Sequence, residues 1–330
     1  MKFQAEKSKK SGIIIFKIME IEDLLKYFQT HKGYLKRSVS QIANRTHSRI
    51  SDVIEAKRIL RANKYEEDFK RAKLPKILIF DIETAPMKAY VWKVWKENIS
   101  IDQTISDWFV ICWSAKWLYS ADMMSGCVTP EEAVNEDDSR IVKDLWKLFD
   151  EADMVVAHNG RKFDVPKMNS RFLVNGLNPP KPYYIIDTLQ VAQKQFGFAS
   201  NKLDALAVYF GYPRKLDTDF TLWSKCLEGD KESLDYMLEY NKQDVVLLEE
   251  VYLKLRPWIK NHPNVGNYLN METNICSTCG SDNVSLIEDK YYYTSVNKYR
   301  LYRCNCCGAV SRGRKSVVNN NVNLTSTMRD

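Results

Sequence analysis

The sequence predicts an α/β protein in which a mixed sheet is flanked by helices, with a helical unit before it and a small cysteine-rich unit after it. The continuous apolar run ILIF at 77–80 is typical of a strand buried on both faces. Strand-like and helix-like stretches then alternate as far as residue 255, as they do in layered α/β domains. Five of the eight cysteines lie from Cys276 onward, which marks a separate C-terminal unit.

Length and composition bound the organisation of the protein. The chain has 330 residues, of which 45% are hydrophobic and 12% aromatic, so two or three folded units are expected. No run of about 18 uncharged apolar residues is present, so we expect no membrane span. The N-terminal apolar run is interrupted by Lys17 and Glu20, and no small-residue cleavage site follows it. We therefore expect a cytoplasmic protein.

Positive charge is concentrated near the N-terminus. Residues 1–76 contain 19 Lys and Arg against nine Asp and Glu, an excess of ten, whereas the whole chain carries +7. Such a segment attracts polyanions by releasing condensed counterions, so nucleic acid is the expected partner. A solvated basic tail at 1–18 explains the first lysines equally well.

Residues 19–72 are expected to form a helical domain with its linker. The charged stretch at 63–75 is expected to be this linker, which leads into the next domain. Ser38–Gln41 offers a capping box for one short helix, and Ser48 offers an N-cap for the next. Two short helices about a tight turn resemble a helix-turn-helix, which would present its second helix to a DNA groove. Docking on a protein is the alternative for such a hairpin. The residues expected to face the groove are Arg49, Ser51, Asp52, Glu55 and Lys57.

Residues 73–262 are expected to form the α/β domain. After the first strand, two strand-like stretches at 108–119 and 123–128 are close enough to pair as antiparallel neighbours. The pattern predicts a mixed sheet with helices on both faces. The elements expected next are a helix at 140–151, a strand at 154–158, a helix at 165–174, a strand at 183–186 and helices to residue 255.

Asp81 and Glu83 lie two residues apart at the end of the first strand, so both side chains project from the same face. Two carboxylates about 4 Å apart repel by about 4 kcal/mol at an effective dielectric constant of about 20, and a divalent cation removes that penalty. Hard oxygen ligands suit Mg²⁺ or Mn²⁺. By itself the pair is also compatible with two solvated acids at a strand end.

Two further motifs carry acids. Residues 159–164, Asn-Gly-Arg-Lys-Phe-Asp, follow the strand at 154–158, where Asp164 could equally be a helix cap. Tyr240 and Asp244 lie four residues apart in a late helix, hence on one face and about 5–6 Å apart. Each of these motifs is common when it occurs alone.

The three motifs in this order resemble those of the DEDDy 3′-5′ exonucleases, over about residues 75–260. The similarity is to the proofreading exonuclease domains of family B DNA polymerases and to stand-alone relatives, many of them in phages. It implies a ribonuclease H-like fold with a five-stranded mixed sheet. It also implies a metal-dependent hydrolase that degrades single-stranded DNA from its 3′ end in phage-type DNA replication, repair or recombination, in the host cytoplasm if phage-encoded.

The resemblance implies a two-metal mechanism with two Mg²⁺ or Mn²⁺ ions. Asp81 would bridge both ions. Glu83 and Asp244 would complete the site of the ion that activates water, and Asp164 would help to hold the second ion. Tyr240 would orient the attacking hydroxide.

The resemblance also implies contacts with the substrate. Asn159 and Phe163 are expected to shape the site of the terminal nucleotide. The stretch at 200–204 resembles a segment of the stand-alone relatives, and its Lys202 could meet a phosphate. An ordinary helix N-terminus capped by Ser200 is the alternative.

Other residues that could suggest chemistry are expected to be structural. The histidine type of these exonucleases would need a histidine where Glu239 stands, so His158 is not expected to be a general base. Trp108, Trp113 and Trp117 fall within a strand-like stretch and are expected to pack in the core rather than stack on bases.

Two Cys-x-x-Cys-Gly turns, one with Cys276 and Cys279 and one with Cys304 and Cys307, predict a zinc ribbon. Four thiolates close the coordination shell of a structural Zn²⁺, and the glycines let backbone N–H groups approach the sulfur atoms. Cys306 could replace a neighbour as a ligand. Disulfides are the alternative that an intracellular protein disfavours.

The predicted ribbon covers residues 272–316, and residues 317–330 have too little to bury, so a disordered tail is expected there. The expected partner is single-stranded DNA with a 3′ end, and a polymerase or helicase could accompany it. A non-catalytic DNA-end-binding or regulatory protein is the alternative from a different class. An RNase or a structure-selective endonuclease that uses the same site is another.

Overall fold

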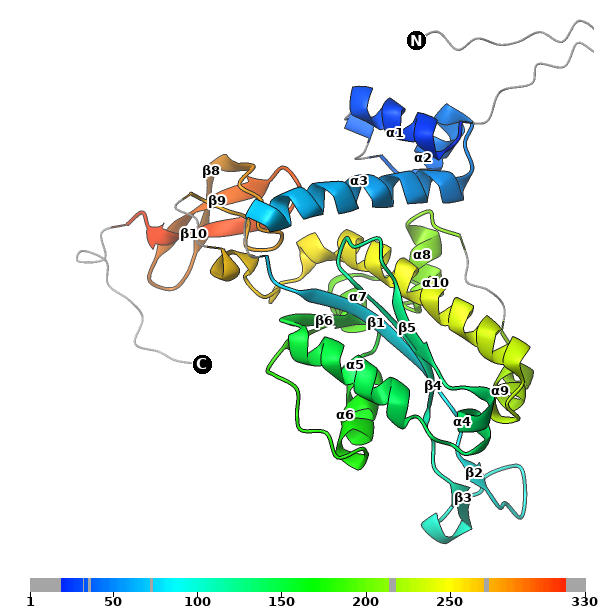
Figure 1. The fold of residues 1–330 in the computed structure, drawn as a ribbon. Helices are drawn as coiled ribbons and strands as arrows, with labels where there is room; N and C mark the ends of the chain where they lie inside the picture. The colour runs from blue at the N-terminus through cyan, green and yellow to red at the C-terminus, as the bar shows by residue number, and fades with distance from the viewer. Residues whose placement is uncertain are drawn as a thin grey trace, which may run out of the picture.

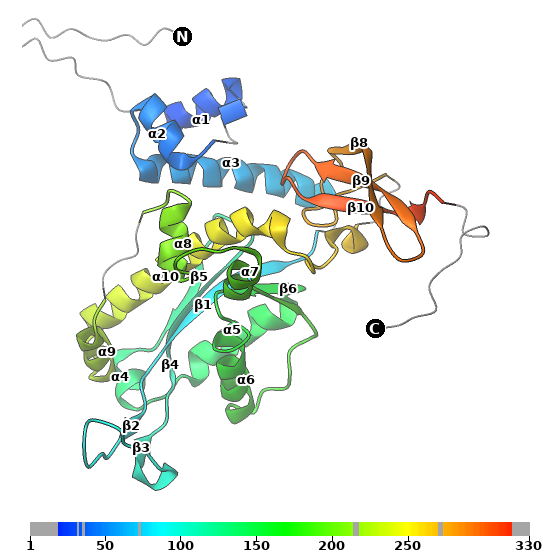
Figure 2. The same cartoon turned by 180° about the vertical axis from the view of Figure 1, so that it is seen from behind.

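The computed structural model describes residues 19–31, 33–34, 37–71, 74–213, 218–269 and 273–318. The basic tail expected at 1–18 and most of the C-terminal tail expected at 317–330 lie outside them. An α/β domain occupies the middle of the molecule (Figure 1). The N-terminal helices and the C-terminal sheet lie at one end of it, and a two-stranded arm projects from the other end (Figure 2).

A five-stranded mixed sheet forms the centre of the domain, in the order β5-β4-β1-β6-β7. Strand β1 pairs antiparallel with β4 and parallel with β6. The predicted mixed α/β, ribonuclease H-like fold is confirmed, and the later strands begin and end close to their expected bounds. The strands are β1 (Ile77–Thr84), β4 (Val110–Trp117), β5 (Met124–Cys127), β6 (Met154–Ala157) and β7 (Tyr184–Asp187).

Helices cover both faces of the sheet: α5 and α6 pack on one face and α10 crosses the other (Figure 1). Within the described parts of the chain, no helix has the length and apolarity needed to cross a membrane. The helices are α4 (Pro130–Val134), α5 (Ser139–Glu151), α6 (Asp164–Val174), α7 (Thr188–Gln195), α8 (Leu203–Tyr209), α9 (Phe220–Leu227) and α10 (Lys231–Leu255), followed by the 3-10 turns η3 (Arg256–Trp258) and η4 (Val265–Tyr268).

Strand β1 is buried on both faces, as its apolar run predicts. Ile77 and Ile79 belong to the core that includes α10, whereas Leu78 and Phe80 belong to the core that includes α5 and α6. Because side chains alternate along a strand, Asp81 and Glu83 continue the row that faces α10. The strand thus changes from apolar to acidic on a single face.

The N-terminal unit consists of α1 (Ile21–Thr30), α2 (Val39–Thr46) and α3 (Ile50–Arg71). The predicted capping box of Ser38 and Gln41 is present at the start of α2. The tight turn after α2 is formed by His47 in the left-handed conformation, with φ of 53°. The linker predicted at 63–75 is wrong for most of its length, because its lysines, glutamates and arginine are good helix formers and continue α3 as far as Arg71.

Two further expectations about α3 are wrong. The helix begins at Ile50, so Ser48 is not its N-cap, and the Ser48 hydroxyl instead accepts a hydrogen bond from Thr46 Oγ1 (2.9 Å). Lys57 does not face a groove: it is 5% exposed, and its Nζ donates to the carbonyl oxygen of Arg37 (2.8 Å). Burial lowers the pKa of Lys57 to about 8. The other four residues of the expected DNA-facing set are exposed or half-buried.

The C-terminal unit is a three-stranded antiparallel sheet in the order β10-β9-β8. Its turn at Gly280 packs against Leu74, Val265 and Leu269, and the Val265 N–H donates to the carbonyl oxygen of Ser277 (2.8 Å). The unit therefore rests on the α/β domain beside α3 (Figure 1). Its strands are β8 (Val284–Tyr293), β9 (Lys298–Cys304) and β10 (Val310–Ser316).

Candidate active site

Asp81 and Glu83 of β1 meet Asp244 of α10. Each offers a carboxylate oxygen, and the three oxygens lie within 4.8 Å of one another. Further along the same contact, apolar side chains from both elements, Ile79 and Leu248 among them, share one core. The strand and the helix thus change from apolar to acidic at the same level, which brings the carboxylates together.

Asn241 orients one of these carboxylates. Its Nδ2 donates to Asp81 Oδ2 (2.8 Å), and the residue is 0% exposed. Asn241 Oδ1 is also buried and has no hydrogen-bond partner among the described residues. A neutral donor holds the carboxylate in position while leaving its negative charge in place. The only sequence signal for this role is the spacing of three to Asp244, which puts both on neighbouring positions of one helix face.

Tyr240 is half-buried and lies one turn before Asp244 on α10. Its neighbour Glu239 faces away from the site, because its side chain is 62% exposed and accepts a hydrogen bond from Lys242 Nζ (2.7 Å). The helix therefore directs the tyrosine, and not position 239, toward the core side. The proposed contact of Tyr240 with a hydroxide stays a prediction.

Asp164 lies beside β1 but outside the group of three carboxylates. Strand β6 pairs with β1 only as far as Ile79, and beyond that point the backbone of Ile82 is close enough to the Asp164 carboxyl to oppose the rise in its pKa. The side chain is 3% exposed, and burial raises its pKa to about 7, with the charge of Asp187 adding to the shift. Phe163, and not Asp164, occupies the N-cap position of α6.

Asp187, at the end of β7, holds the loop at 159–163. Its Oδ1 accepts from the Asn159 N–H and its Oδ2 from the Arg161 N–H, both at 3.1 Å. Asn159 has a left-handed φ of 72°, and a Cβ at Gly160 would lie 2.5 Å from a side chain of the preceding strand, so the turn requires glycine. From the sequence alone Asp187 resembles an ordinary cap of α7, which it also is.

Phe163 is 40% exposed at the start of α6. Lys167 Nζ lies 5.1 Å from the centroid of its ring and 3.6 Å from that of Trp108. Trp108 precedes β4 rather than lying in it, but it is half-buried and packs against the core of the sheet, as expected.

His158 ties the end of β6 to the chain before α8. Its Nδ1 lies 2.9 Å from Thr188 Oγ1 and its Nε2 lies 3.0 Å from the carbonyl oxygen of Asn201. Both ring nitrogens thus have partners within the fold, which agrees with the structural role expected for this residue. Lys202, rather than Ser200, is the N-cap residue of α8, and its exposed side chain keeps the phosphate contact a prediction.

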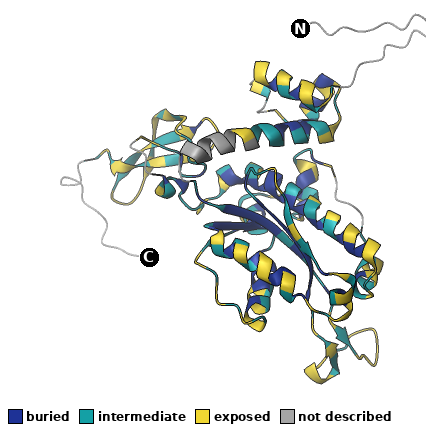
Figure 3. Ribbon diagram, viewed as in Figure 1, coloured by how far each residue is buried: buried dark blue, intermediate teal, exposed yellow. Residues whose placement is uncertain are grey.

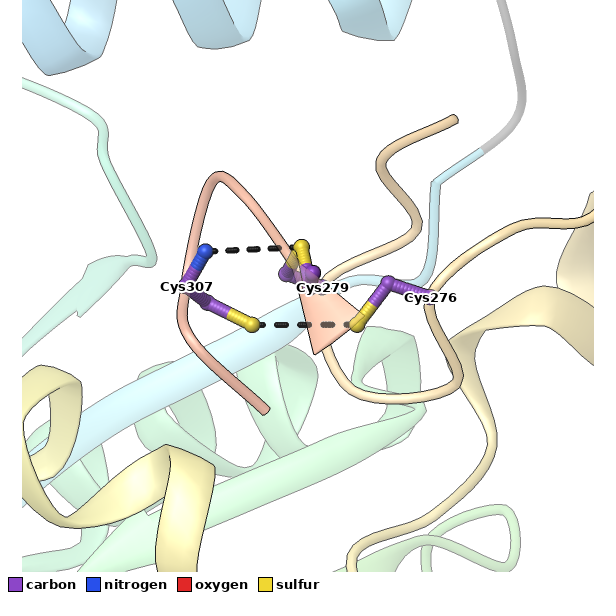
Figure 4. Close-up of side chains that lie close together, drawn as sticks. Cys276, Cys279 and Cys307 are labelled. Atoms are coloured by element: carbon purple, nitrogen blue, oxygen red, sulfur yellow. Dashed lines mark hydrogen bonds between the residues drawn. The ribbon is translucent and has the colours of Figure 1, made fainter. Parts of the chain in front are cut away.

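The four predicted cysteines also come together. The sulfur atoms of Cys276, Cys279, Cys304 and Cys307 lie within 4.8 Å of one another. Those of Cys276 and Cys307 are 3.7 Å apart (Figure 4), and those of Cys279 and Cys304 are 3.6 Å apart. Tetrahedral Zn–S bonds of about 2.3 Å place sulfur atoms about 3.8 Å apart, so the spacing fits Zn²⁺. Cys306 is exposed and lies outside the group.

The two cysteine turns have the same backbone design. Gly280 and Gly308 have left-handed φ angles of 75° and 86°. In the first turn the backbone nitrogen of Thr278 lies 3.4 Å from Cys276 Sγ. In the second turn the backbone nitrogen of Cys307 lies 3.4 Å from Cys304 Sγ. Hydrogen bonds from neighbouring thiols hold the pKa of Cys276 well below its usual range. None of the eight cysteines, all of which lie in described parts of the chain, forms a disulfide, so the disulfide alternative is not formed.

The chain is similar to several known proteins. The RNase_H_2 family model, described as RNase H superfamily, matches residues 122–256. The chain is 25% identical over 180 residues to the DNA polymerase III PolC-type of Ureaplasma parvum, which covers 52% of this chain and 11% of that protein. The structure of the present chain aligns with the family B DNA polymerase of Pyrobaculum calidifontis at 17% identity and a TM-score of 0.42. The alignment covers 56% of this chain and 25% of that polymerase.

The chain thus spans only 11% of the length of the curated relative that it matches. The family match contains Asp164, Tyr240 and Asp244, and it begins after β1, which supplies the other two acids. Those two acids lie at the end of β1, which is the central strand of the sheet. The α/β domain therefore matches the RNase H superfamily model from β5 to α10, and the chain is similar to part of a DNA polymerase.

Proposed function

We propose that the protein is a metal-dependent 3′-5′ exonuclease of the DEDDy type that hydrolyses single-stranded DNA. The observation that carries this proposal is the meeting of Asp81, Glu83 and Asp244 within 4.8 Å. Each pair of carboxylates at about 4 Å repels by about 4 kcal/mol at an effective dielectric constant of about 20. A divalent cation converts this repulsion into attraction, so the cluster is understandable as a cation site.

The donor atoms fit Mg²⁺ or Mn²⁺, because they are hard oxygen atoms. Asp81, Glu83 and Asp244 would hold one ion, and Asp164 would help to hold a second ion together with Asp81. When bound, two such ions activate a water molecule and stabilise the leaving oxygen in an in-line displacement at phosphorus. The buried, unpartnered Asn241 Oδ1 adds another oxygen atom near the same carboxylates.

The protein's own groups would position the reactants. Asn241 holds the Asp81 carboxylate. The Asp187 carboxylate fixes the turn that leads to Phe163, whose exposed ring would cover a terminal base. The Tyr240 hydroxyl would orient the attacking water. The exposed position of Glu239 supports the tyrosine type, because this is where the histidine type has its histidine.

Hydrolysis of a 5′-labelled single strand with Mg²⁺ or Mn²⁺ tests the proposal. We expect a ladder of products shortened from the 3′ end and no cutting of circular single strands. Asp81→Asn is the matched inactive control, because it preserves side-chain shape. Intact linear strands in both metals would leave the DNA-end-binding or regulatory alternative, whereas cut circles would indicate an endonuclease. An RNA strand of the same sequence decides between DNA and RNA.

We also propose that the four cysteines hold one structural Zn²⁺ and so form a zinc ribbon. The matching sulfur separations support it. Cys279→Ser is expected to lose the zinc and unfold the ribbon, because binding of about 10–16 kcal/mol is the folding energy of such units. Cys306→Ser is the matched control, and elemental analysis should find one zinc per chain in it. Equal zinc in both variants would reject the site.

The flanking units are proposed to bind duplex nucleic acid or a replication partner such as a polymerase or helicase. Arg49 and Ser51 are exposed at the start of α3. The ribbon presents four exposed arginines, Arg300, Arg303, Arg312 and Arg314. Exposed guanidinium groups bind phosphates readily, which supports contact with nucleic acid.

A further inference from the structure

The two-stranded arm, residues 85–107, exposes large aromatic side chains. It contains β2 (Lys88–Ala89), η2 (Ile101–Gln103) and β3 (Thr104–Ser106). Tyr90, Trp92 and Trp95 are 74%, 94% and 81% exposed. Side chains of this kind are normally covered, and a group of them on a surface marks a binding site. Figure 3 shows the contrast between the buried sheet and the exposed arm.

Hydrogen bonds hold the tip of the arm in this arrangement. The Glu97 carboxylate accepts from the backbone N–H groups of Trp92 (3.1 Å) and Lys93 (2.8 Å). Gln103 Nε2 donates to the carbonyl oxygen of Tyr90 (3.0 Å). Polar groups thus occupy the inside of the turn and aromatic rings its outside. The usual arrangement, in which apolar side chains lie inside and polar groups outside, is therefore reversed at the tip.

The arm is joined to the active site at its base. It begins two residues after Glu83 and returns to the sheet through Asp107 and Trp108. Lys167 Nζ stands over the Trp108 ring at 3.6 Å and 5.1 Å from the centroid of the Phe163 ring, and it also feels the charges of Asp107 and Asp164. Aromatic and basic groups therefore lie at the base of the arm, next to the acidic site.

The tip combines flat rings with positive charge. The exposed lysines Lys93 and Lys96 alternate with Trp92 and Trp95 along the chain. The acid between them and the stem, Glu97, accepts the two backbone hydrogen bonds described above. Aromatic rings stack on any base, and lysines follow the phosphates, so this pattern fits a single strand of nucleic acid regardless of sequence.

We propose that the arm binds the single-stranded substrate by stacking Trp92 and Trp95 on bases that lie away from the 3′ end in the acidic site. The proposal rests on the proposed function of that site. A protein partner would also cover apolar side chains. The continuity with Phe163 and the alternating lysines favour nucleic acid instead.

Equilibrium binding of a long fluorescent single strand, without added Mg²⁺ or Mn²⁺, tests the arm separately from hydrolysis. Trp92→Leu and Trp95→Leu keep apolar area but lose the stacking face, so each is expected to weaken binding about tenfold. Trp92→Phe and Trp95→Phe should keep binding within about threefold of wild type. Trp258→Leu is the matched control, because Trp258 is 61% exposed at the far end of α10 and should bind normally.

The lysines give a second readout. Lys93→Ala and Lys96→Ala are each expected to reduce the slope of log K against log salt by about 0.7, the value for one phosphate contact of a single strand. Leucine variants that bind the strand as wild type does would overturn the proposal and assign the arm to a protein partner. Loss of binding in these variants supports the arm even if wild type hydrolyses no strand, and that result would reject only the proposed enzyme.

Discussion

Helix α10 carries buried acids in two places, and their surroundings are opposite. Glu249 and Glu250 face cations that come from other elements. Asp244, less than two turns earlier, faces the carboxylates of Asp81 and Glu83. The three acids of α10 are equally buried, at 2–3% exposure, so burial does not separate them. What separates them is the charge of their partners.

Each of the two glutamates pairs with a cation and accepts a hydrogen bond. Glu249 pairs with Lys116 and accepts from the Tyr119 N–H (2.7 Å). Glu250 pairs with Arg61 of α3 and accepts from the Tyr212 hydroxyl, both at 2.5 Å. Burial alone would raise the pKa of Glu250, but the Arg61 guanidinium lowers it. Glu250 thus joins α3 to α10, and Glu249 joins the sheet to α10.

The comparison shows how to separate structural acids from functional ones on the same helix. An acid paired with cations of its own chain is already compensated. An acid placed among other acids needs a cation from outside, and this need is what makes it useful for chemistry on phosphates. The contrast can be tested by substitutions in each group.

The largest effect is expected in the acidic group. Asp244→Asn should lower the rate of hydrolysis at least about 1000-fold, because a bound metal ion contributes several kcal/mol to the transition state. The free energy of unfolding without metal should stay unchanged or rise, since a repulsion is removed. Rate measurements and urea unfolding together check this. A rate near that of wild type would show that Asp244 is not a metal ligand.

The ion pair of Arg61 with Glu250 should show the reverse result, a loss of stability. Arg61→Ala leaves the Glu250 carboxylate buried without its cation and is expected to lower the free energy of unfolding by about 3–5 kcal/mol. Lys231→Ala is the matched control, because it removes an exposed ion pair with Asp235 on the same helix and should cost under about 0.5 kcal/mol. Equal losses in the two variants would contradict a structural role for Glu250.

Asp164→Asn connects stability to pH. The native pKa of about 7 lies above the usual 3.8, so the native state keeps a proton that the unfolded state releases between these values. The buried carboxyl therefore lowers stability as pH rises through this window, by up to about 4 kcal/mol above pH 7. The variant should unfold at a higher temperature than wild type at pH 8 without metal. The difference should vanish near pH 4, while a difference independent of pH would exclude this explanation.

The smallest effect concerns the tyrosine. Tyr240→Phe removes one hydrogen-bonding group and is expected to lower kcat about tenfold while leaving KM close to wild type. Steady-state kinetics on a single strand would measure both constants. A large rise in KM with unchanged kcat would mean that Tyr240 binds the ground state rather than orienting the nucleophile.

Local periodicity determined much of this protein from its sequence. The spacing of two between Asp81 and Glu83 and of four between Tyr240 and Asp244 set which side chains share a face, because strand and helix periods are short-range properties. The apolar run of β1 and the paired Cys-x-x-Cys turns are local signals of the same kind. The mixed sheet, its helices and the cysteine group followed from them.

Only the tertiary structure decided which residues meet across the chain. Asn241 and Asp81 are 160 positions apart, and no local pattern links them. Tertiary packing also left Asp164 outside the group of three and buried Lys57. The physical reason is that an acid's role depends on the charges that surround it. Glu250 beside Arg61 and Asp244 beside Asp81 acquire their surroundings only when distant segments pack together.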